Sequence, residues 1–343
     1  MHVLVIGGTR FVGRLLTYRL IAARHRVTLF NRGTMTDPFG DRVERLVGDR
    51  TTPDFERLLA SRTFDAVVDF AAYVGSDVQR SIDLFSGRIG HYVFISTGQV
   101  YLVRAAAPVP AREEDYHGAT IPEPSDPHDR DDFSYGIGKR ACEDALAAAP
   151  DFPSTRLRIP MVNGERDHHR RIESYLHRLL DGHELVVPDG GTRPMRHVYG
   201  DDVARTIVAL LGAPPATSEA FNLAQDETPT LVEVLSMLAE LLGARPVLLG
   251  VPSRALLEGG VEEITEVSPF SGKWMSFLDP SKAKARLGFR ATPLHEQLGR
   301  IVASFLAHPP PHPPDGYLRY RSKELAIARA QLSQEPSKNG PPG

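Results

Sequence analysis

Short apolar runs alternate with helix-like segments along the first half of the chain. Four clear runs, Val3–Ile6, Val27–Phe30, Ala66–Phe70 and Tyr92–Ile95, each end at small or polar residues, and a weaker run leads to Gly48-Asp49. Apolar residues at helical spacing follow the first run. This alternation is typical of a parallel sheet covered by helices, in which ligands bind at the carboxyl ends of the strands. We therefore predict an α/β fold with a doubly wound parallel sheet.

The pattern changes further along the chain. Residues 102–134 are rich in proline, glycine and acidic residues, which predicts a long loop, and a helix is expected from about Tyr135 to Ala148. A strand is predicted at Thr155–Ile159. After Gly164 the segments become short and mixed, which indicates a smaller, partly interleaved domain.

Three later segments complete this organisation. We expect the strand near 220–224 to return to the main sheet, and an amphipathic helix at Leu231–Leu242 with Thr230 as its N-cap. The predicted second domain covers 165–306. Residues 307–343 are expected to form a proline-rich linker, a short helix and a disordered tail. Lys273–Phe277, which contains Trp274, is expected to be a strand or hairpin.

Composition narrows the possible classes. With 343 residues and 41% apolar residues, the chain can bury a sizeable core, and a net charge of −3 disfavours a dedicated nucleic-acid binder. Cys142 is the only cysteine, so an intramolecular disulfide is excluded. No apolar stretch reaches the ~18 residues of a membrane span. We expect a soluble cytoplasmic protein with no membrane or nucleic-acid partner.

A glycine-rich turn joins the first strand to the first helix. Its sequence is Gly7-Gly8-Thr9-Arg10-Phe11-Val12-Gly13. Glycine allows a tight turn and a close approach to a pyrophosphate, which the helix N-terminus stabilises. The alternative is a plain strand-to-helix turn.

A tyrosine and a lysine four residues apart follow the fifth strand. Tyr135 and Lys139 share one face of the expected helix. A nearby ammonium favours the phenolate, so the tyrosine can exchange a proton with a hydroxyl or a carbonyl.

With these motifs, the chain resembles the extended (atypical) short-chain dehydrogenase/reductases, the NAD-dependent epimerase/dehydratase family, over about residues 1–306. Gly7 and Gly13 match the first and third glycines of the family motif, while Arg10 replaces the second. The variant resembles a branch that includes chloroplast stem-loop RNA-binding proteins and bacterial sugar-modifying enzymes. The resemblance implies a Rossmann-like dinucleotide-binding domain over 1–164 and, since relatives often dimerise, a possible homodimer.

The second strand bears on the choice of cofactor. Asn31 and Arg32 stand where a carboxylate would hold the ribose of NAD, and a guanidinium favours the 2′-phosphate of NADP(H). Alternatively, Arg32 stacks on the adenine or faces solvent. The resemblance implies that Asp49 accepts a hydrogen bond from the adenine. The candidate NAD(P)-binding residues are Gly7, Thr9, Arg10, Phe11, Val12, Gly13, Asn31, Arg32, Asp49, Phe70, Ala71, Ala72, Ser96, Tyr135 and Lys139.

The resemblance also assigns the reactive groups. Tyr135 is the acid/base, Lys139 lowers its pKa and holds the nicotinamide ribose, and Thr97 orients the reacting oxygen, with Ser96 the lesser candidate. Family 4,6-dehydratases carry an Asp-Glu pair after the threonine. Gly98-Gln99 stands here instead, so we do not expect dehydration.

Residues further along are candidates for contacts with a small-molecule substrate. They are Gln99, Asn163, Arg193, Arg196 and His197. Met161 and Met195 replace an asparagine and an arginine that sugar-nucleotide epimerases of the family carry, which disfavours a standard epimerase of that kind. The basic segment 166–171 is either an anion-binding loop or a solvated one, and no metal site is expected.

The expected function is therefore an NAD(P)-dependent oxidoreductase that interconverts a hydroxyl and a ketone on a sugar-like or nucleotide-linked small molecule. Epimerisation and net reduction or oxidation use the same residues and stay open. The alternative is an RNA-binding or regulatory protein of the same fold without catalysis.

Overall fold

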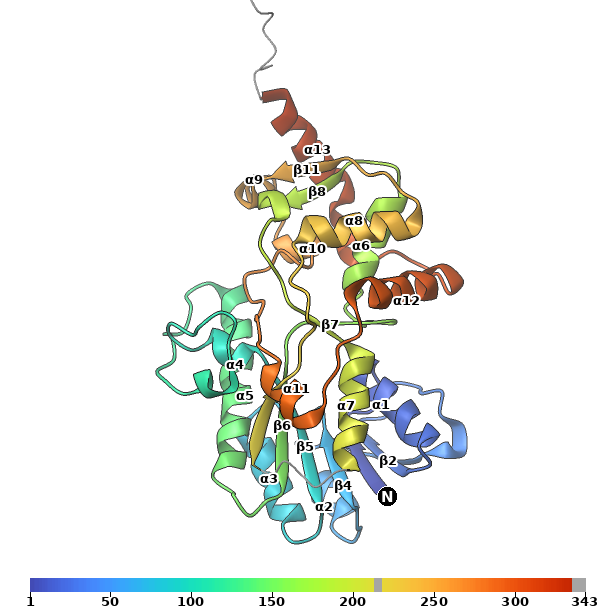
Figure 1. Ribbon diagram of the computed structural model, residues 1–343, viewed down its shortest axis with the longest axis vertical. Helices are drawn as coiled ribbons and strands as arrows, with labels where there is room; N and C mark the ends of the chain where they lie inside the picture. The colour runs from blue at the N-terminus through green and yellow to red at the C-terminus, as the bar shows by residue number, and fades with distance from the viewer. Residues whose placement is uncertain (213–217, 335–343) are drawn as a thin grey trace, which may run out of the picture. The chain divides into compact units, whose positions relative to one another are not determined.

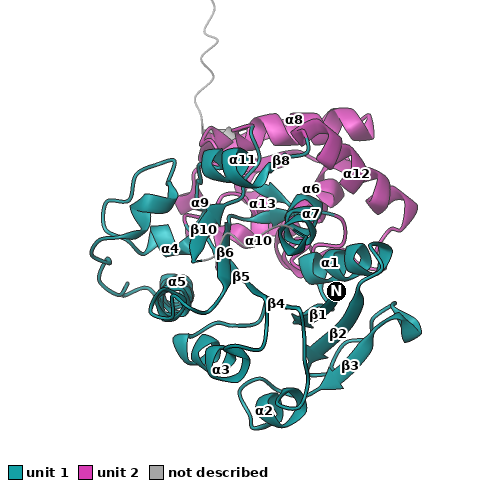
Figure 2. Cartoon of the chain, turned by 60° about the horizontal axis from the view of Figure 1, so that its bottom comes forward, with its two compact units in different colours: residues 1–164, 196–226, 274–292 teal, residues 165–195, 227–273, 293–343 magenta. Residues whose placement is uncertain are grey.

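The computed structural model describes residues 1–212 and 218–334, and the tail expected to be disordered lies mainly outside them. The chain divides into two compact units, coloured separately in Figure 2. Unit 1 contains residues 1–164, 196–226 and 274–292. Unit 2 contains residues 165–195, 227–273 and 293–343.

Unit 1 is built on a seven-stranded sheet in which every pair of neighbours is parallel, which confirms the predicted fold class (Figure 1). The strand order is β10-β6-β5-β4-β1-β2-β3. The direction of winding reverses between β1 and β4, where doubly wound sheets bind their ligands. The strands are β1 (His2–Ile6), β2 (Arg26–Asn31), β3 (Glu44–Val47), β4 (Ala66–Asp69), β5 (His91–Thr97), β6 (Ser154–Ile159) and β10 (Glu219–Asn222).

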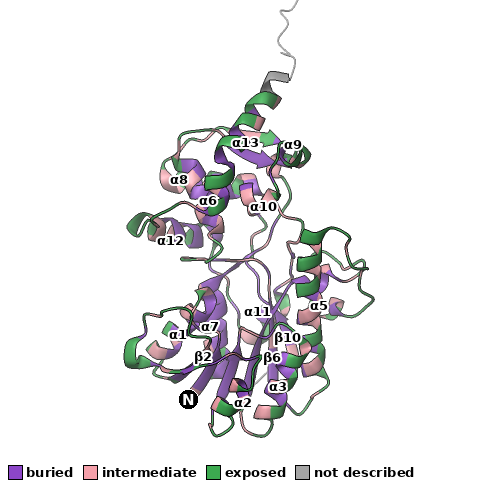
Figure 3. Cartoon of the chain, turned by 180° about the vertical axis from the view of Figure 1, so that it is seen from behind, coloured by how far each residue is buried: buried purple, intermediate pink, exposed green. Residues whose placement is uncertain are grey.

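Successive residues of each strand face opposite helical layers. Val3 and Val5 pack in one core with α1 (Phe11–Ala22) and α7 (Gly200–Leu211). Leu4 and Ile6 pack in the other core with α2 (Asp54–Leu59), α3 (Gly75–Phe85) and α5 (Pro127–Ala147). Because both faces are covered, the central strands β1 and β4 are largely apolar and buried, as Figure 3 shows for the middle of the sheet.

Helix α5 begins earlier than the sequence pattern indicated. It starts at Pro127 rather than near Tyr135, because the Asp126 side chain accepts hydrogen bonds from the backbone N–H groups of His128 and Asp129. An aspartate at the N-cap followed by proline at the first helical position favours a helix start. The extra turns place residues 127–134 on the same helix as Tyr135.

The remaining elements of unit 1 are short. They are η1 (Gly40–Arg42), α4 (Gln99–Leu102), η2 (Glu113–Tyr116), the paired strands β7 (Val162–Asn163) and β9 (Val198–Tyr199), and α11 (Ser281–Leu287). The strand or hairpin predicted around Trp274 was wrong. Residues 273–277 are irregular, because the contacts of Trp274 and Phe277 are single hydrogen bonds and not a strand ladder. The indole N–H of Trp274 donates to Asp129 at 2.8 Å, and the backbone carbonyl of Phe277 accepts a bond from the N–H of Ala111.

Unit 2 combines helices with one pair of parallel strands, β8 (Leu185–Pro188) and β11 (Leu248–Val251). Helix α8 (Leu231–Leu242) has the predicted bounds, and Thr230 is its N-cap as predicted, since its hydroxyl oxygen accepts a bond from the N–H of Glu233. The Glu233 carboxylate accepts a bond from the N–H of Thr230 in return. The other elements are α6 (Arg171–Leu180), η3 (Asp189–Gly191), α9 (Ser253–Glu258), α10 (Ile264–Val267), α12 (Leu294–Ala307) and α13 (Asp315–Gln334). Within residues 1–212 and 218–334, the helices all fall short of the length and apolarity that a bilayer crossing requires.

Candidate active site

The glycine turn packs tightly between β1 and α1. Gly7 has a φ of +88°, which an L side chain rarely adopts, and a Cβ there would lie 3.3 Å from the Cβ of Phe70. A Cβ on Gly13 would lie 2.8 Å from the carbonyl oxygen of Gly7. The backbone therefore passes close to the end of β4 at a point where no side chain would fit.

The first turn of α1 has the character of an anion site. No side chain caps this 12-residue helix, and no acidic residue lies in its first turn. Its first N–H groups can therefore donate hydrogen bonds to a phosphate, and the positive end of its dipole can stabilise the negative charge. Arg10 at the N-cap position is exposed.

The ends of β2 and β3 carry the residues expected near the adenosine. The Asn31 side-chain oxygen accepts a hydrogen bond of 2.8 Å from the backbone N–H of Gly33, while Arg32 is exposed. Asp49 accepts bonds from the backbone N–H and hydroxyl of Thr51, and these bonds lower the pKa of its carboxyl group. The side chains of Asn31 and Asp49 are thus held by hydrogen bonds within their own turns.

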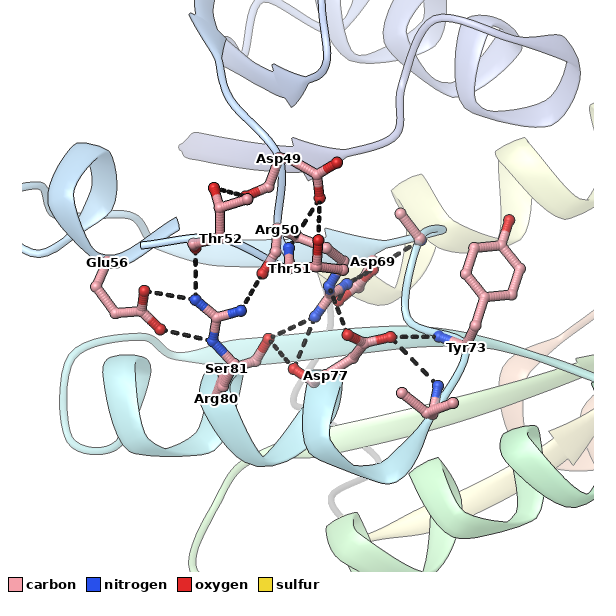
Figure 4. Close-up of polar contacts among 12 residues, drawn as sticks. Asp49, Arg50, Thr51, Thr52, Glu56, Asp69, Tyr73, Asp77, Arg80 and Ser81 are labelled. Atoms are coloured by element: carbon pink, nitrogen blue, oxygen red, sulfur yellow. Dashed lines mark hydrogen bonds and ion pairs between the residues drawn. The ribbon is translucent and has the colours of Figure 1, made fainter. Parts of the chain in front are cut away.

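A buried ionic cluster below this edge was missed by the sequence analysis (Figure 4). The guanidinium of Arg50 donates to both oxygens of Asp69, at 2.9 and 2.7 Å, and to the backbone carbonyl of Asp77 at 2.7 Å. Asp77 in turn accepts bonds from the backbone N–H groups of Tyr73 and Val74. The cluster therefore ties the loop after β3 to the loop after β4.

The three predicted catalytic side chains lie together in unit 1. Tyr135 forms a hydrogen bond with Thr97, the last residue of β5, and the Lys139 ammonium lies 5.9 Å from the centre of the Tyr135 ring. Tyr135 is 37% exposed, whereas Lys139 is 2% exposed. The Lys139 ammonium donates to the carbonyl of Ile95 at 2.8 Å, which holds it against β5.

Burial shifts the pKa values of both titrating groups. It raises the pKa of Tyr135 to about 12, although the hydrogen bond with Thr97 acts to lower it. It lowers the pKa of Lys139 to about 8, so the amine remains mostly protonated at neutral pH. The expected lowering of the tyrosine pKa is therefore not produced by the protein groups alone, because burial outweighs them; a cationic nicotinamide would act in the favourable direction.

Ser96 and Thr97 have different partners. The Ser96 hydroxyl donates to the carboxylate of Glu143 at 2.5 Å, and Glu143 forms a buried ion pair with Arg158. Thr97 instead pairs with Tyr135. The structure therefore brings Thr97, and not Ser96, to the candidate acid/base Tyr135.

Gly98 lies beneath a segment distant in sequence. A Cβ at this position would lie 2.0 Å from the Ser276 hydroxyl oxygen and 2.5 Å from its Cβ. The site therefore has no space for an acidic side chain directly after Thr97 unless Ser276 moves.

The predicted substrate residues are in four environments. The side-chain amide of Asn163 lies 2.9 Å from Nδ1 of His197, and both residues are 3% exposed. Arg196 stacks on Phe277, with 4.8 Å between its guanidinium and the ring centre, and donates to the Leu278 carbonyl. Arg193 is exposed and belongs to unit 2. The backbone N–H of Gln99 contacts the Thr97 hydroxyl oxygen directly, at 3.2 Å.

The groups at this sheet edge fit a dinucleotide. The tight turn at Gly7 and Gly13 and the uncapped start of α1 suit a pyrophosphate. Tyr135 and Lys139 lie on α5 and contact the carboxyl end of β5, at the same edge of the sheet. A nicotinamide would be held there.

Comparisons with known proteins agree with this arrangement. Residues 3–224 match the NAD dependent epimerase/dehydratase family. The chain is 27% identical over 242 residues to the chloroplast stem-loop binding protein of 41 kDa b from Arabidopsis thaliana, covering 66% of this chain and 60% of that protein. It is 29% identical over 234 residues to 2'-dehydrokanamycin reductase from Streptomyces kanamyceticus, covering 65% and 62%.

The chain thus spans about 60% of the length of these curated relatives. Among solved structures, UDP-glucuronic acid 4-epimerase from Bacillus cereus, in complex with UDP-glucuronic acid and NAD, superposes with a TM-score of 0.67 at 19% identity. That match covers 90% of this chain and 99% of the epimerase chain, and at this identity it shows the shared fold. Because the family match extends over well more than half of the residues, the chain belongs to the NAD dependent epimerase/dehydratase family.

Proposed function

We propose that the protein is an NAD(P)-dependent oxidoreductase that interconverts a hydroxyl and a ketone on a sugar-like small molecule. The observation that carries this proposal is the grouping of Tyr135, Thr97 and Lys139 at the carboxyl end of β5. The family, the reductase relative and the NAD-binding structural neighbour support it.

The residues divide the chemistry between them. Thr97 and Tyr135 hydrogen-bond the reacting oxygen of the substrate, and Tyr135 takes its proton during oxidation or returns it during reduction. Lys139, held by the Ile95 carbonyl, places a positive charge near the Tyr135 ring and would hold the nicotinamide ribose of a bound cofactor. A bound nicotinamide would accept or supply the hydride.

Tyr135→Phe tests this assignment, since it removes only the proton-carrying oxygen. We expect turnover to fall at least 100-fold, as loss of a general acid/base does, with cofactor affinity nearly unchanged. Tyr18→Phe is the matched control, because Tyr18 has the same exposure of 37%. Full activity of the Tyr135→Phe protein would overturn the proposal.

We further propose that NADP(H) is preferred to NAD. The support is the exposed guanidinium of Arg32 directly after β2, where Asn31 and Arg32 stand in place of the carboxylate that would hold the ribose of NAD. Arg32→Asp should shift the ratio of the two dissociation constants towards NAD, measured by fluorescence titration. An unchanged ratio would show that Arg32 does not contact this phosphate.

We propose that the reaction is not a 4,6-dehydration. Gly98 and Gln99 do not titrate, and Ser276 occupies the space that a side chain at position 98 would need. Epimerisation and net reduction share the same residues. Mass spectrometry of nucleotide released on denaturation separates them, because a retained, stoichiometric dinucleotide favours epimerisation.

RNA binding is a second candidate, because one curated relative is named for binding a stem-loop. Under this alternative, structured RNA would be retained on filters at physiological salt while NAD(P) would not quench the protein fluorescence. The net charge of −3 disfavours it, since RNA affinity rests largely on basic residues.

A further inference from the structure

Strand β6 presents two arginines to one face of the sheet. Leu157 packs in the core with α1 and α7, so its neighbours Arg156 and Arg158 face the opposite layer, which contains α5. Arg158 forms a buried ion pair with Glu143 of α5. In residues 1–212 and 218–334, by contrast, Arg156 forms no ion pair. A guanidinium without a counter-ion therefore stands beside one that is neutralised.

The guanidinium of Arg156 is only partly satisfied. Its Nη2 donates to the backbone carbonyl of Ser218, and its Nε is buried without an acceptor. In the part of the chain that the structure describes, Nη1 also has no acceptor, and it is not enclosed by protein atoms as Nε is. Burial lowers the pKa of Arg156, although the charge of Glu143 acts to raise it. A half-buried cation of this kind is stabilised by an anion that binds to it.

Arg156 lines a cavity of about 410 Å³ within unit 1. The wall is formed mainly by η2, α5, β6, β10 and α11, which are the elements at one edge of the sheet (Figure 1). A volume of this size is typical of small-molecule sites. The wall contains none of the candidate catalytic or cofactor-binding residues, so the cavity is a separate location from the candidate active site.

The wall of the cavity carries an excess of negative charge. Its five carboxylates and three cationic side chains are Glu113, Glu114, Glu143, Asp144 and Glu219, and Arg156, Arg158 and Lys282. Arg158 is paired with Glu143, and Lys282 with Glu219. A plain anion would therefore be attracted by Arg156 and repelled by the remaining carboxylates, whereas a ligand with its own positive charge would be attracted by both.

We infer that this cavity binds a small zwitterion, a molecule with one carboxylate and one ammonium group, such as an amino acid. The ligand carboxylate accepts hydrogen bonds from the Arg156 guanidinium, whose planar N–H groups match two carboxylate oxygens. The ammonium group is attracted to the unneutralised carboxylates. Asp144 is one of these, because the Tyr116 hydroxyl that donates to it at 2.7 Å is uncharged.

Four probes with the same five-carbon chain test the inference: 2-aminopentanoate, 5-aminopentanoate, pentanoate and pentylamine. The two zwitterions differ in the distance between their charges, and each of the other probes lacks one charge. Their dissociation constants are measured by calorimetry on the full chain at neutral pH. We expect at least one zwitterion to bind more tightly than both pentanoate and pentylamine.

Arg156→Gln tests the carboxylate contact. It should weaken binding of the zwitterion roughly 10- to 100-fold, the range for a hydrogen bond to a charged group. Arg24→Gln is the matched control, because Arg24 is exposed in unit 1 and lies outside the cavity wall, and it should leave the affinity unchanged. Without ligand, Arg156→Gln should not lower the melting temperature, since no ion pair is lost. A marked fall in the melting temperature would make Arg156 a structural residue and overturn the inference.

Asp144→Asn tests the ammonium contact. Because Asp144 is exposed, its loss should reduce the preference for the zwitterion over pentanoate only roughly 2- to 5-fold, the range for an exposed charge pair. Asp151→Asn is the matched control, since it removes an exposed carboxylate of unit 1 from outside the wall. It should leave the preference unchanged.

The inference is overturned if neither zwitterion binds below about 10 mM, or if pentanoate or pentylamine binds as tightly as both. Equal effects of Arg156→Gln and Arg24→Gln, or of Asp144→Asn and Asp151→Asn, would also overturn it. Saturating NADP⁺ should not displace the zwitterion, and displacement would place the probe in the dinucleotide site instead. None of these measurements depends on turnover, so the inference stands or fails separately from the proposed reaction.

Discussion

The buried ion pair of Glu143 and Arg158, beside β5, gives a sharp test of how unit 1 is stabilised. Glu143 is 1% exposed and Arg158 is 3% exposed. Arg158 donates to the Glu143 carboxylate through Nε at 3.0 and 3.1 Å and through Nη2 at 2.6 Å, and Ser96 donates to the same carboxylate. Glu143→Gln removes the negative charge while keeping the size of the side chain.

The expected cost is large because the Arg158 charge would stay buried without its counter-ion. Breaking a buried pair in this way costs about 3–5 kcal/mol. At roughly 2–4 °C per kcal/mol for a unit of about 200 residues, the melting temperature should fall by roughly 6–20 °C. Glu114→Gln, at an exposed position in the same unit, should shift it by less than about 2 °C.

Thermal unfolding followed by circular dichroism measures the effect, and a double variant tests its cause. Replacing Glu143 and Arg158 together by methionine should cost less than the sum of the two single replacements, since no charge is then left unpaired. Additive losses, or a Glu143→Gln shift as small as the control, would refute this reasoning.

The same pair predicts a dependence on pH. Burial by itself would raise the pKa of Glu143, but the charge of Arg158 holds it below the ordinary value. The ionised Glu143 therefore contributes its full stabilisation above about pH 4.3, which is the pKa of glutamate in an unfolded chain. This stabilisation is lost as the pH falls through the lower pKa of Glu143 in the folded state. The difference between wild type and Glu143→Gln should narrow below about pH 4.

Three further perturbations test other parts of the molecule. Lys139→Met should abolish turnover yet stabilise the fold at pH 7 by about 1–3 kcal/mol. Because burial lowers the pKa of Lys139 to about 8, this gain in stability should shrink between pH 8 and 10.5. A Lys139→Met protein that is less stable than wild type at pH 7 would contradict this prediction. Gly98→Ala should destabilise by about 1–3 kcal/mol in urea titrations through contact with Ser276, and Ser276→Gly should restore most of the loss. Glu324→Gln should weaken the attachment of α13 to the rest of unit 2, because Glu324 forms an ion pair with the buried Arg178. Limited proteolysis should then cleave residues 315–334 faster than in wild type. An unchanged cleavage rate would show that this ion pair is not the main contact that holds α13.

Local signals were sufficient for much of the fold. Strands buried on both faces read as short apolar runs, so their positions could be predicted without knowledge of their neighbours. Helix α8 was predicted to the residue because its cap, Thr230 with Glu233, is a local hydrogen-bonding arrangement. The start of α5 had a similar signal in Asp126-Pro127, and the acidic, proline-rich surroundings obscured it.

The paired contacts of the site depend on residues far apart in the chain. Ser96 and Thr97 are adjacent, and only the position of Glu143 on α5 determines that Ser96 faces the ion pair. Likewise, Arg50 is indistinguishable from a surface arginine until the fold brings Asp69 and Asp77 to it. These partners are 19 to 47 residues apart, beyond the range of periodicity or capping signals.

The sequence by itself determined the alternation of strands and helices, the glycine turn and the spacing of Tyr135 and Lys139, because backbone preference and hydrophobic periodicity act between neighbouring residues. Tertiary structure decided which side chains meet: Asp132 with Gln99, Ser276 over Gly98, and Thr97 with Tyr135. It also decided the direction of the pKa shifts, since burial is a property of the packed molecule and not of any segment.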